Sequence, residues 1–417
     1  MRVERPASTG QVVAAVERAA TDGLTLRPTG AGHSVTPLVP TDGVLVDLAA
    51  MDRLLAVDHA RRQVRVQAGV RLGMLADWLV SVGLAFDNLG DIDRQTLAGA
   101  LATGTHGTGE SLGNLATQVV ALRLVDGTGR VHDLSAADGD RFLAARVGLG
   151  ALGIVTEVTL QATDAYRLRG HDRVEPLAEV LDGFLDRAGR HRHFEAYAFP
   201  YSEHALTRTN DIVDGPARPR GAVGTWAYDR LVVTHALDAV CRVGRRFPAT
   251  IPTLNRAISR LAGDVPRVDE AHRIFVSARD VRFTEMELAV PREAGIPLLR
   301  EILRFVVARR LPVNFPIEVR TAAGDDALLS TAQGRDTVYL AVHAYVGMPF
   351  EDYFAGVWER ARDHGARPHW GKRHPATADD LRPRYPGWDR FVAVRADLDP
   401  DGRFRNPHLD RVLGPIA

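Results

Sequence analysis

The sequence predicts an α+β protein of two domains, and three observations support this expectation. The chain has 417 residues, which is more than one hydrophobic core usually organises. Residues 1–162 alternate short apolar strands with amphipathic helices, whereas longer charged segments alternate with strands from residue 163 onward. The last part, residues 367–417, is rich in Pro, Gly, Trp and His. We therefore expect a first domain over 1–162, a second over 163–366, and a C-terminal segment over 367–417 too irregular to form a domain alone.

Local signals place the first elements of the chain. Ser8 and Gln11 have the spacing of a capping box, and apolar residues follow at helical spacing over residues 12–20. Apolar runs at residues 24–26 and 44–48 predict two short strands. The first of them runs into a glycine-containing turn, where the backbone can approach a ligand closely.

Local signals also place the remaining strands and helices of the first domain. Alternation over residues 64–66 predicts a half-buried strand, and leucines at helical spacing over residues 72–79 predict a helix that ends near Gly83. Residues 119–125 and the turn at 126–129 predict a hairpin. A glycine loop at residue 150 then leads into another strand.

The second domain is predicted to be a sheet covered by helices. Residues 195–199 and 313–319 are typical of strands, and residues 298–307 are typical of an amphipathic helix. Cys241, the single cysteine, stands in an apolar run and is interpreted as a small buried residue, so no disulfide and no catalytic thiol are expected.

Composition excludes several classes of protein. Lys plus Arg and Asp plus Glu number 52 each, and zero net charge argues against a nucleic-acid partner. The N-terminus lacks an apolar signal core, and no apolar run is long enough to span a membrane. We therefore expect a soluble, cytoplasmic protein with no membrane association. His106 has no second ligand at metal-binding spacing, so no metal is expected.

Two glycine loops carry the first chemical signal. Residues 27–34 read Arg-Pro-Thr-Gly-Ala-Gly-His-Ser, and residues 103–109 read Thr-Gly-Thr-His-Gly-Thr-Gly. Glycines let a flat or anionic ligand approach the backbone, and free N–H groups can bind phosphate oxygens. The first loop lacks the third glycine of a dinucleotide fingerprint, because Val35 stands there, and by itself it could equally be an ordinary turn.

Five segments in a fixed order make the sequence recognisable. These are residues 30–34, 88–93 (Asn-Leu-Gly-Asp-Ile-Asp), 103–109, 150–156 and the pair formed by Glu318-Val319-Arg320 and residues 368–372 (Pro-His-Trp-Gly-Lys). Together they resemble the vanillyl-alcohol oxidase superfamily, and most closely its aldonolactone oxidoreductases, over nearly the whole chain. The resemblance implies a PCMH-type FAD-binding domain, a cap domain with an antiparallel sheet, and a C-terminal segment that returns to the flavin.

The same resemblance assigns the cofactor contacts. His33 matches the position that bonds covalently to the flavin in covalent members of the family, so covalent FAD is expected. The other implied FAD contacts are Thr29, Gly30, Ala31, Gly32, Ser34, Gly90, Thr96, Gly99, Thr103, Gly104, Thr105, His106, Val155 and His369. Many relatives begin with an additional Trp- and Asn-containing segment, which this sequence lacks before its first strand; how that edge of the flavin domain is covered is left open.

The resemblance also implies the substrate site. A flavin that oxidises an alcohol takes a hydride at N5 while the hydroxyl proton passes to a base. Glu318 and Arg320 are two residues apart on a predicted strand and so share a face; with Lys372 they match the family's substrate-site residues. We expect Arg320 and Lys372 to stabilise charge, Glu318 to bind the reacting hydroxyl, and Asp91 to bind a polyhydroxylated substrate.

His343 and Gly90 indicate which substrate and which electron acceptor to expect within the family. His343 lies in an apolar strand and matches a histidine frequent in the lactone branch, which favours a lactone with His343 as substrate contact or base. Gly90 matches the position that gates oxygen, and glycine there favours an oxidase that uses molecular oxygen and releases hydrogen peroxide. The alternatives are an alditol oxidase, a dehydrogenase of the same fold, a biosynthetic tailoring oxidase, and a flavin-binding protein without turnover.

Overall fold

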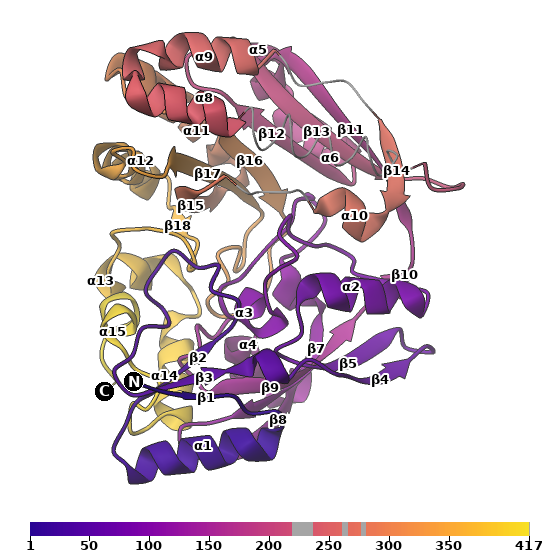
Figure 1. Ribbon diagram of the computed structural model, residues 1–417, viewed down its shortest axis with the longest axis vertical. Helices are drawn as coiled ribbons and strands as arrows, with labels where there is room; N and C mark the ends of the chain where they lie inside the picture. The colour runs from indigo at the N-terminus through magenta and orange to yellow at the C-terminus, as the bar shows by residue number, and fades with distance from the viewer. Residues whose placement is uncertain (219–236, 261–265, 277–280, 417) are drawn as a thin grey trace.

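The computed structural model describes residues 1–416 except 219–236, 261–265 and 277–280. Figure 1 shows two stacked regions, with the N-terminal sheets at one end of the long axis and a large sheet at the other. The C-terminal segment, coloured yellow, returns to lie beside the N-terminal region. The expected α+β fold is confirmed.

The N-terminal region holds a parallel sheet and an antiparallel sheet. The parallel sheet has the order β1-β3-β2, with β1 (Arg2–Glu4), β2 (Leu26–Thr29) and β3 (Val44–Asp47). The antiparallel sheet has the order β4-β5-β9-β7-β8, with β4 (Leu54–Asp58), β5 (Gln63–Gln67), β7 (Val119–Val125), β8 (Val131–Ser135) and β9 (Ile154–Gln161). The predicted hairpin at residues 119–135 is therefore confirmed.

Helix α1 (Thr9–Thr21) begins at the predicted cap. The Ser8 side chain accepts a hydrogen bond from the Gln11 backbone N–H at 3.4 Å, while the Gln11 side chain accepts one from the N–H of Ala7. The other helices of this region are α2 (Leu72–Ser81), α3 (Leu97–Ala102), α4 (Asp140–Ala145) and the 3₁₀-helices η1 (Leu48–Ala50), η2 (Leu115–Gln118) and η3 (Ala136–Asp138). The short strands β6 (Leu84–Ala85) and β10 (Thr163–Asp164) pair where the chain leaves this region.

The second region is built on one antiparallel sheet with the order β14-β11-β13-β12-β16-β17-β15-β18. Its strands are β11 (Arg167–Pro176), β12 (His193–Ala198), β13 (His204–Ile212), β14 (Arg267–Glu270), β15 (Phe283–Pro291), β16 (Ile317–Ala322), β17 (Thr337–Tyr345) and β18 (Arg367–Pro368). The strand expected over residues 313–319 begins four residues late, because Pro312 and Pro316 lack the N–H that a sheet ladder needs.

Helices cover this sheet as expected (Figure 1). They are α5 (Leu177–Asp182), α6 (Phe184–Arg190), α8 (Leu237–Arg246), the 3₁₀-helix η5 (Pro248–Thr250), α9 (Ile251–Ile258), α10 (Ala271–Phe275), α11 (Arg292–Ala308) and α12 (Glu351–Asp363). Helix α11 buries Leu298, Leu299, Ile302 and Val306, the apolar stripe of the predicted helix. Cys241 on α8 is fully buried, as predicted.

The C-terminal segment is more regular than its composition suggests. It forms α13 (Ala378–Leu381), the 3₁₀-helix η6 (Arg382–Arg384), α14 (Trp388–Leu398) and α15 (Pro407–Leu413). Phe404 packs in the cluster that includes residues of α1 and β3, and the N–H of Leu26 bonds the carbonyl of Arg403 at 2.7 Å. The division at 1–162, 163–366 and 367–417 stays a prediction.

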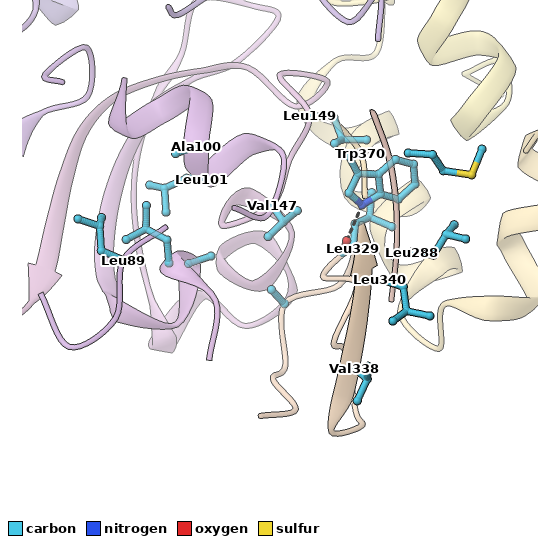
Figure 2. Packing of buried hydrophobic residues seen from close by; sticks show 14 of the residues in the cluster. Leu89, Ala100, Leu101, Val147, Leu149, Leu288, Leu329, Val338, Leu340 and Trp370 are labelled. Carbon is cyan, nitrogen blue, oxygen red and sulfur yellow. Dashed lines mark hydrogen bonds between the residues drawn. The ribbon is translucent and has the colours of Figure 1, made fainter. Parts of the chain in front are cut away.

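One buried cluster joins the two regions. Figure 2 shows Leu101 and Val147 of the N-terminal region on one side, and Leu288 and Leu340 of the large sheet on the other, with Trp370 beside them. The Trp370 ring N–H donates a hydrogen bond to the Leu329 carbonyl at 2.7 Å. This anchored tryptophan fixes the segment that carries His369 and Lys372 at the junction of the two regions.

Candidate active site

A cavity of about 610 Å³ lies against the first glycine loop, and its size is typical of a ligand pocket. Ten of the residues expected at FAD line it: Thr29, Gly30, Ala31, Gly32, His33, Ser34, Thr96, Gly99, Thr103 and Val155. Its other walls include the apolar side chains of Leu101, Leu122, Leu124 and Leu152. An elongated ligand with a flat aromatic part and an anionic part fits such a mixture of apolar walls and exposed backbone.

Glycine is required at two points of the first loop. A Cβ atom on Gly30 would lie 2.2 Å from Oγ1 of Thr96, so any side chain would push the loop away from α3. Gly32 has a φ of +74°, in the left-handed region that favours glycine. These constraints keep the backbone of the loop exposed to the cavity, as a phosphate-binding loop requires.

Arg27 holds the wall of this cavity together and was not expected from the sequence. Its guanidinium donates to the carbonyls of Leu38 (2.8 Å), Leu149 (2.9 Å), Gly150 (2.7 Å) and Phe404 (2.5 Å). Burial, and then the charge of Arg395, lowers the pKa of Arg27 to about 9. The side chain therefore ties the first loop to the loop before β9 and to the C-terminal segment.

A second, smaller cavity of about 70 Å³ adjoins the first. His33, Ser34, Gln95 and Thr103 line both cavities, so His33 stands at their junction. The small cavity is also lined by Gly90, Asp91, Ile92, Thr105, His106, Phe283, Glu285, Glu287, Glu318, Arg320, His369, Gly371 and Lys372. It brings together side chains from both regions and from the C-terminal segment.

Arg320, which lines this cavity, lies among three carboxylates. Its Nε atom is 2.8 Å from Oε2 of Glu195, and its terminal nitrogen bonds Glu318 and lies 3.3 Å from Oδ2 of Asp91. The carboxylates raise the pKa of Arg320 far more than its burial lowers it. The single O–H of Tyr197 lies within hydrogen-bonding distance of Glu195 (2.9 Å) and of Glu318 (3.1 Å) and can donate to either of them. The guanidinium is therefore held rigidly and permanently charged.

Lys372 forms the second cation of the small cavity. Its Nζ atom is 2.5 Å from Oε2 of Glu285, and the other carboxylate oxygen lies 3.6 Å from Nε2 of His343. Burial by itself raises the pKa of Glu285, but the charges of Lys372 and His343 outweigh it and the net shift is downward. The opposing charges of Glu285 and Glu287 keep the pKa of Lys372 above its ordinary value despite burial.

The structure thus brings most of the expected site residues to the two cavities. Two of the expected residues, Gly104 and His343, are not among the described residues that line either cavity. His343 lies behind Glu285, and its ring is edge-on to Phe283 with ring centroids 4.9 Å apart. Glu285, Glu287 and Glu195 were missed by the sequence analysis. Glu285 and Glu287 are two apart in a mostly apolar strand, and two acids on one face of such a strand were the signal that could have found them.

The described residues provide neither a membrane-spanning helix nor a cluster of metal ligands. No described helix is long and apolar enough to cross a membrane. No group of three or more His, Cys, Asp or Glu side chains in the described part of the chain is arranged to hold a metal ion.

The fold and the site together define a class of protein. A glycine-lined cavity for a large cofactor opens into a small, highly charged cavity under a cap sheet, as in FAD-dependent oxidoreductases. Residues 2–135 match the FAD binding domain family, and residues 158–412 match the D-arabinono-1,4-lactone oxidase family. The chain belongs to the D-arabinono-1,4-lactone oxidase family and is an FAD-dependent oxidoreductase.

Individual relatives agree with this membership. The L-gulono-1,4-lactone dehydrogenase of Mycobacterium tuberculosis is 45% identical over 99% of this chain and 96% of that protein. The L-gulonolactone oxidase of Bos taurus is 32% identical over 98% of this chain and 94% of that protein. Among solved structures, a cholesterol oxidase from Brevibacterium sterolicum has a TM-score of 0.84 at 21% identity, covering 99% of this chain and 94% of that one. That likeness shows the shared fold.

Proposed function

We propose that this enzyme oxidises a hydroxyl group of an aldono-1,4-lactone, with FAD bound through His33 and molecular oxygen as the acceptor, giving hydrogen peroxide. The observation that carries the proposal is the small cavity, where Asp91, Glu318, Arg320 and Lys372 meet His33. Carboxylates suit the hydroxyl groups of a sugar, since each hydroxyl can donate to a carboxylate oxygen. The names of the two relatives described above support a lactone as the substrate.

Each charged residue of the small cavity has a role in the proposed oxidation. Bound FAD supplies the hydride acceptor. Glu318 binds the reacting hydroxyl and takes its proton, and Asp91 orients a further hydroxyl. Arg320 and Lys372 provide fixed positive charge where negative charge develops during the reaction. His343 acts through Glu285, whose carboxylate it faces, and so helps to hold Lys372 in place.

The cofactor residues fit FAD. The loop around Gly30 presents backbone to the large cavity, and the residues shared by both cavities would hold the flavin ring. His33 is partly exposed at the junction. Partial burial, followed by the charges of Arg94, Lys372 and Arg71, lowers its pKa. The ring is therefore neutral at neutral pH and keeps a lone pair, as a histidine that bonds to a flavin needs.

The covalent bond is tested by acid denaturation. We expect flavin absorbance to stay with the precipitated wild-type chain and to be released from His33→Ala. The matched control is His59→Ala, because His59 is an exposed histidine in a distant turn and should leave the bond intact. Release of flavin from the wild type would show that the bond does not form, while the lactone oxidation could still hold.

Gly90 is proposed to leave a path for oxygen. A Cβ atom there would lie 3.2 Å from the carbonyl oxygen of His106 and 3.3 Å from Cγ2 of Thr105, so alanine fits only tightly. We expect Gly90→Ala to slow the reaction of the reduced enzyme with oxygen about tenfold, or about 1.4 kcal/mol in the barrier. Reduction by the lactone should change little.

Stopped-flow mixing of the reduced enzyme with oxygen measures this effect. Gly10→Ala is the control, since a Cβ atom on Gly10 meets nothing within 4 Å. An unchanged oxygen rate in Gly90→Ala would place the gate elsewhere. A relative named a dehydrogenase makes a dehydrogenase the second candidate; a wild-type enzyme that is reduced by lactone but reacts only slowly with oxygen would favour it.

The substrate class is tested by anaerobic bleaching of the flavin. A panel of aldono-1,4-lactones and alditols is mixed with the enzyme in the absence of oxygen. Bleaching by lactones alone supports the proposal, whereas bleaching by alditols alone supports an alditol oxidase. No bleaching by either class would favour a tailoring oxidase with another substrate, or a protein without turnover.

A further inference from the structure

His106 of the second glycine loop has an unusual pair of neighbours. Its Nδ1 atom lies 2.8 Å from the carbonyl oxygen of Gly107, and its Nε2 atom lies 3.0 Å from Oε1 of Glu287. Within the described part of the chain, both ring nitrogens therefore face acceptor oxygens. A carbonyl has no hydrogen to give, so Nδ1 must be the donor in the first contact.

The second contact then requires a proton as well. A lone pair on Nε2 facing an ionised carboxylate at 3.0 Å would be repulsive, so a hydrogen must lie between the two atoms. It belongs either to a charged imidazolium beside a carboxylate or to a neutral imidazole beside a carboxylic acid. In both states one hydrogen lies between His106 and Glu287, in addition to the hydrogen on Nδ1, and the pair has no net charge.

The surroundings keep this proton in place. The side chains of His106 and Glu287 are only 3% and 8% exposed, and an unpaired carboxylate is costly at such a position. The Tyr339 ring stacks on His106 with centroids 3.5 Å apart and planes 18° apart. The Tyr339 hydroxyl pairs with Oγ1 of Thr331, so the tyrosine fixes the imidazole ring without competing for its nitrogens.

The charges around Glu287 favour the ionic form of the pair. Burial raises the pKa of Glu287, but the charge and hydrogen bond of His106, and then the charges of His369 and Lys372, bring the net shift below the ordinary value. Glu285, whose own carboxylate pairs with Lys372, lines the same cavity. Whichever of the two atoms holds the shared hydrogen, the pair of His106 and Glu287 has no net charge.

We propose that His106 is the positioning residue that cancels the charge of Glu287 at the wall of the small cavity, and that this neutral pair sets how readily the bound flavin is reduced. The inference rests on FAD binding and is independent of which lactone is oxidised. Reduction places negative charge on the flavin ring. A bare Glu287 carboxylate beside it would oppose that charge, whereas the protonated pair does not.

Single and double substitutions separate this role from a merely structural one. Asn keeps a donor for the Gly107 carbonyl but removes Nε2, so His106→Asn leaves Glu287 without its neutralising partner. The double variant His106→Asn/Glu287→Gln removes both members of the pair and leaves no uncompensated charge. Equilibration of the holoenzyme with a reference redox dye measures the ratio of reduced to oxidised flavin, independently of turnover.

We expect that ratio to fall about tenfold in His106→Asn, the effect of one uncompensated charge at close range, and to return to within about twofold of wild type in the double variant. An unchanged ratio in His106→Asn, or a double variant no better than His106→Asn, overturns the proposal. Should His106→Asn fail to fold, a neutron crystal structure of the wild-type holoenzyme decides. A hydrogen between Nε2 of His106 and Oε1 of Glu287 supports the proposal, and its absence overturns it.

Discussion

Replacement of Arg320 by methionine is expected to lower the turnover number at least about 100-fold and the free energy of unfolding by about 3–5 kcal/mol. Methionine keeps much of the length of the side chain and removes its charge. The carboxylates of Asp91, Glu195 and Glu318, which contact the guanidinium in the wild type, would then face one another. Without the guanidinium their negative charges repel one another, and Glu318 would lose the position in which it binds the reacting hydroxyl.

Steady-state kinetics and denaturant unfolding measure the two effects. The control is Arg190→Met, because the Arg190–Asp186 ion pair is 3.8 Å long and both side chains are more than 70% exposed; such pairs contribute about 0–1 kcal/mol. Loss of activity in Arg320→Met with wild-type stability would mean that the carboxylates do not depend on Arg320. Loss of stability with an unchanged turnover number would show that Arg320 has no role in catalysis.

Replacement of Trp370 by alanine is the second substitution with a large expected effect. The indole is fully buried at the junction of the two regions (Figure 2), and its removal should cost about 3–5 kcal/mol of stability. The Leu329 carbonyl loses its donor, and the stacked Tyr385 ring, 5.4 Å away, loses its partner. Because Trp370 lies between His369 and Lys372, the enzyme should also lose turnover and flavin affinity.

Trp370→Phe separates the contributions of packing and hydrogen bonding. It retains an aromatic ring and loses the N–H, so most of the packing should persist and a cost of about 1–3 kcal/mol should remain for the unsatisfied Leu329 carbonyl. Chemical unfolding followed by flavin and tryptophan fluorescence measures both variants. Equal losses in the two variants would show that the hydrogen bond, and not the packing, anchors this segment.

The sequence predicted best those elements whose signals are local. Helix α1 begins at Ser8 because a cap needs only a side chain and a backbone N–H three residues on, and the hairpin of β7 and β8 depends on the turn between them. The strand that begins at residue 317 was predicted to begin at residue 313, because the apolar pattern extends upstream of Pro316. Pairing does not extend there, since proline lacks the backbone N–H. The helices of the C-terminal segment were missed because they are short and stabilised by packing.

The candidate site shows a similar division. Recognition of the glycine loops and of Glu318-Val319-Arg320 led to the residues that line the two cavities. His343 was expected at the substrate, yet it lies behind Glu285. Alternation along a strand tells which face a residue occupies but not which side chain of the neighbouring strand stands in front of it. Glu285 and Glu287 went unnoticed because the sequence does not show which strands are paired.

By itself the sequence determined the cofactor class and the family of this protein. Gly30 is needed because Thr96 lies too close for a side chain, and Gly32 because its backbone has a positive φ. Such local requirements leave a recognisable pattern of glycines in the sequence. Only the tertiary structure decided which charges meet. Arg320 is paired with Asp91 and Glu195, and His106 with Glu287, across long stretches of chain. The Coulomb energy of two charges depends on the distance between them and on their burial, and the sequence alone gives neither quantity.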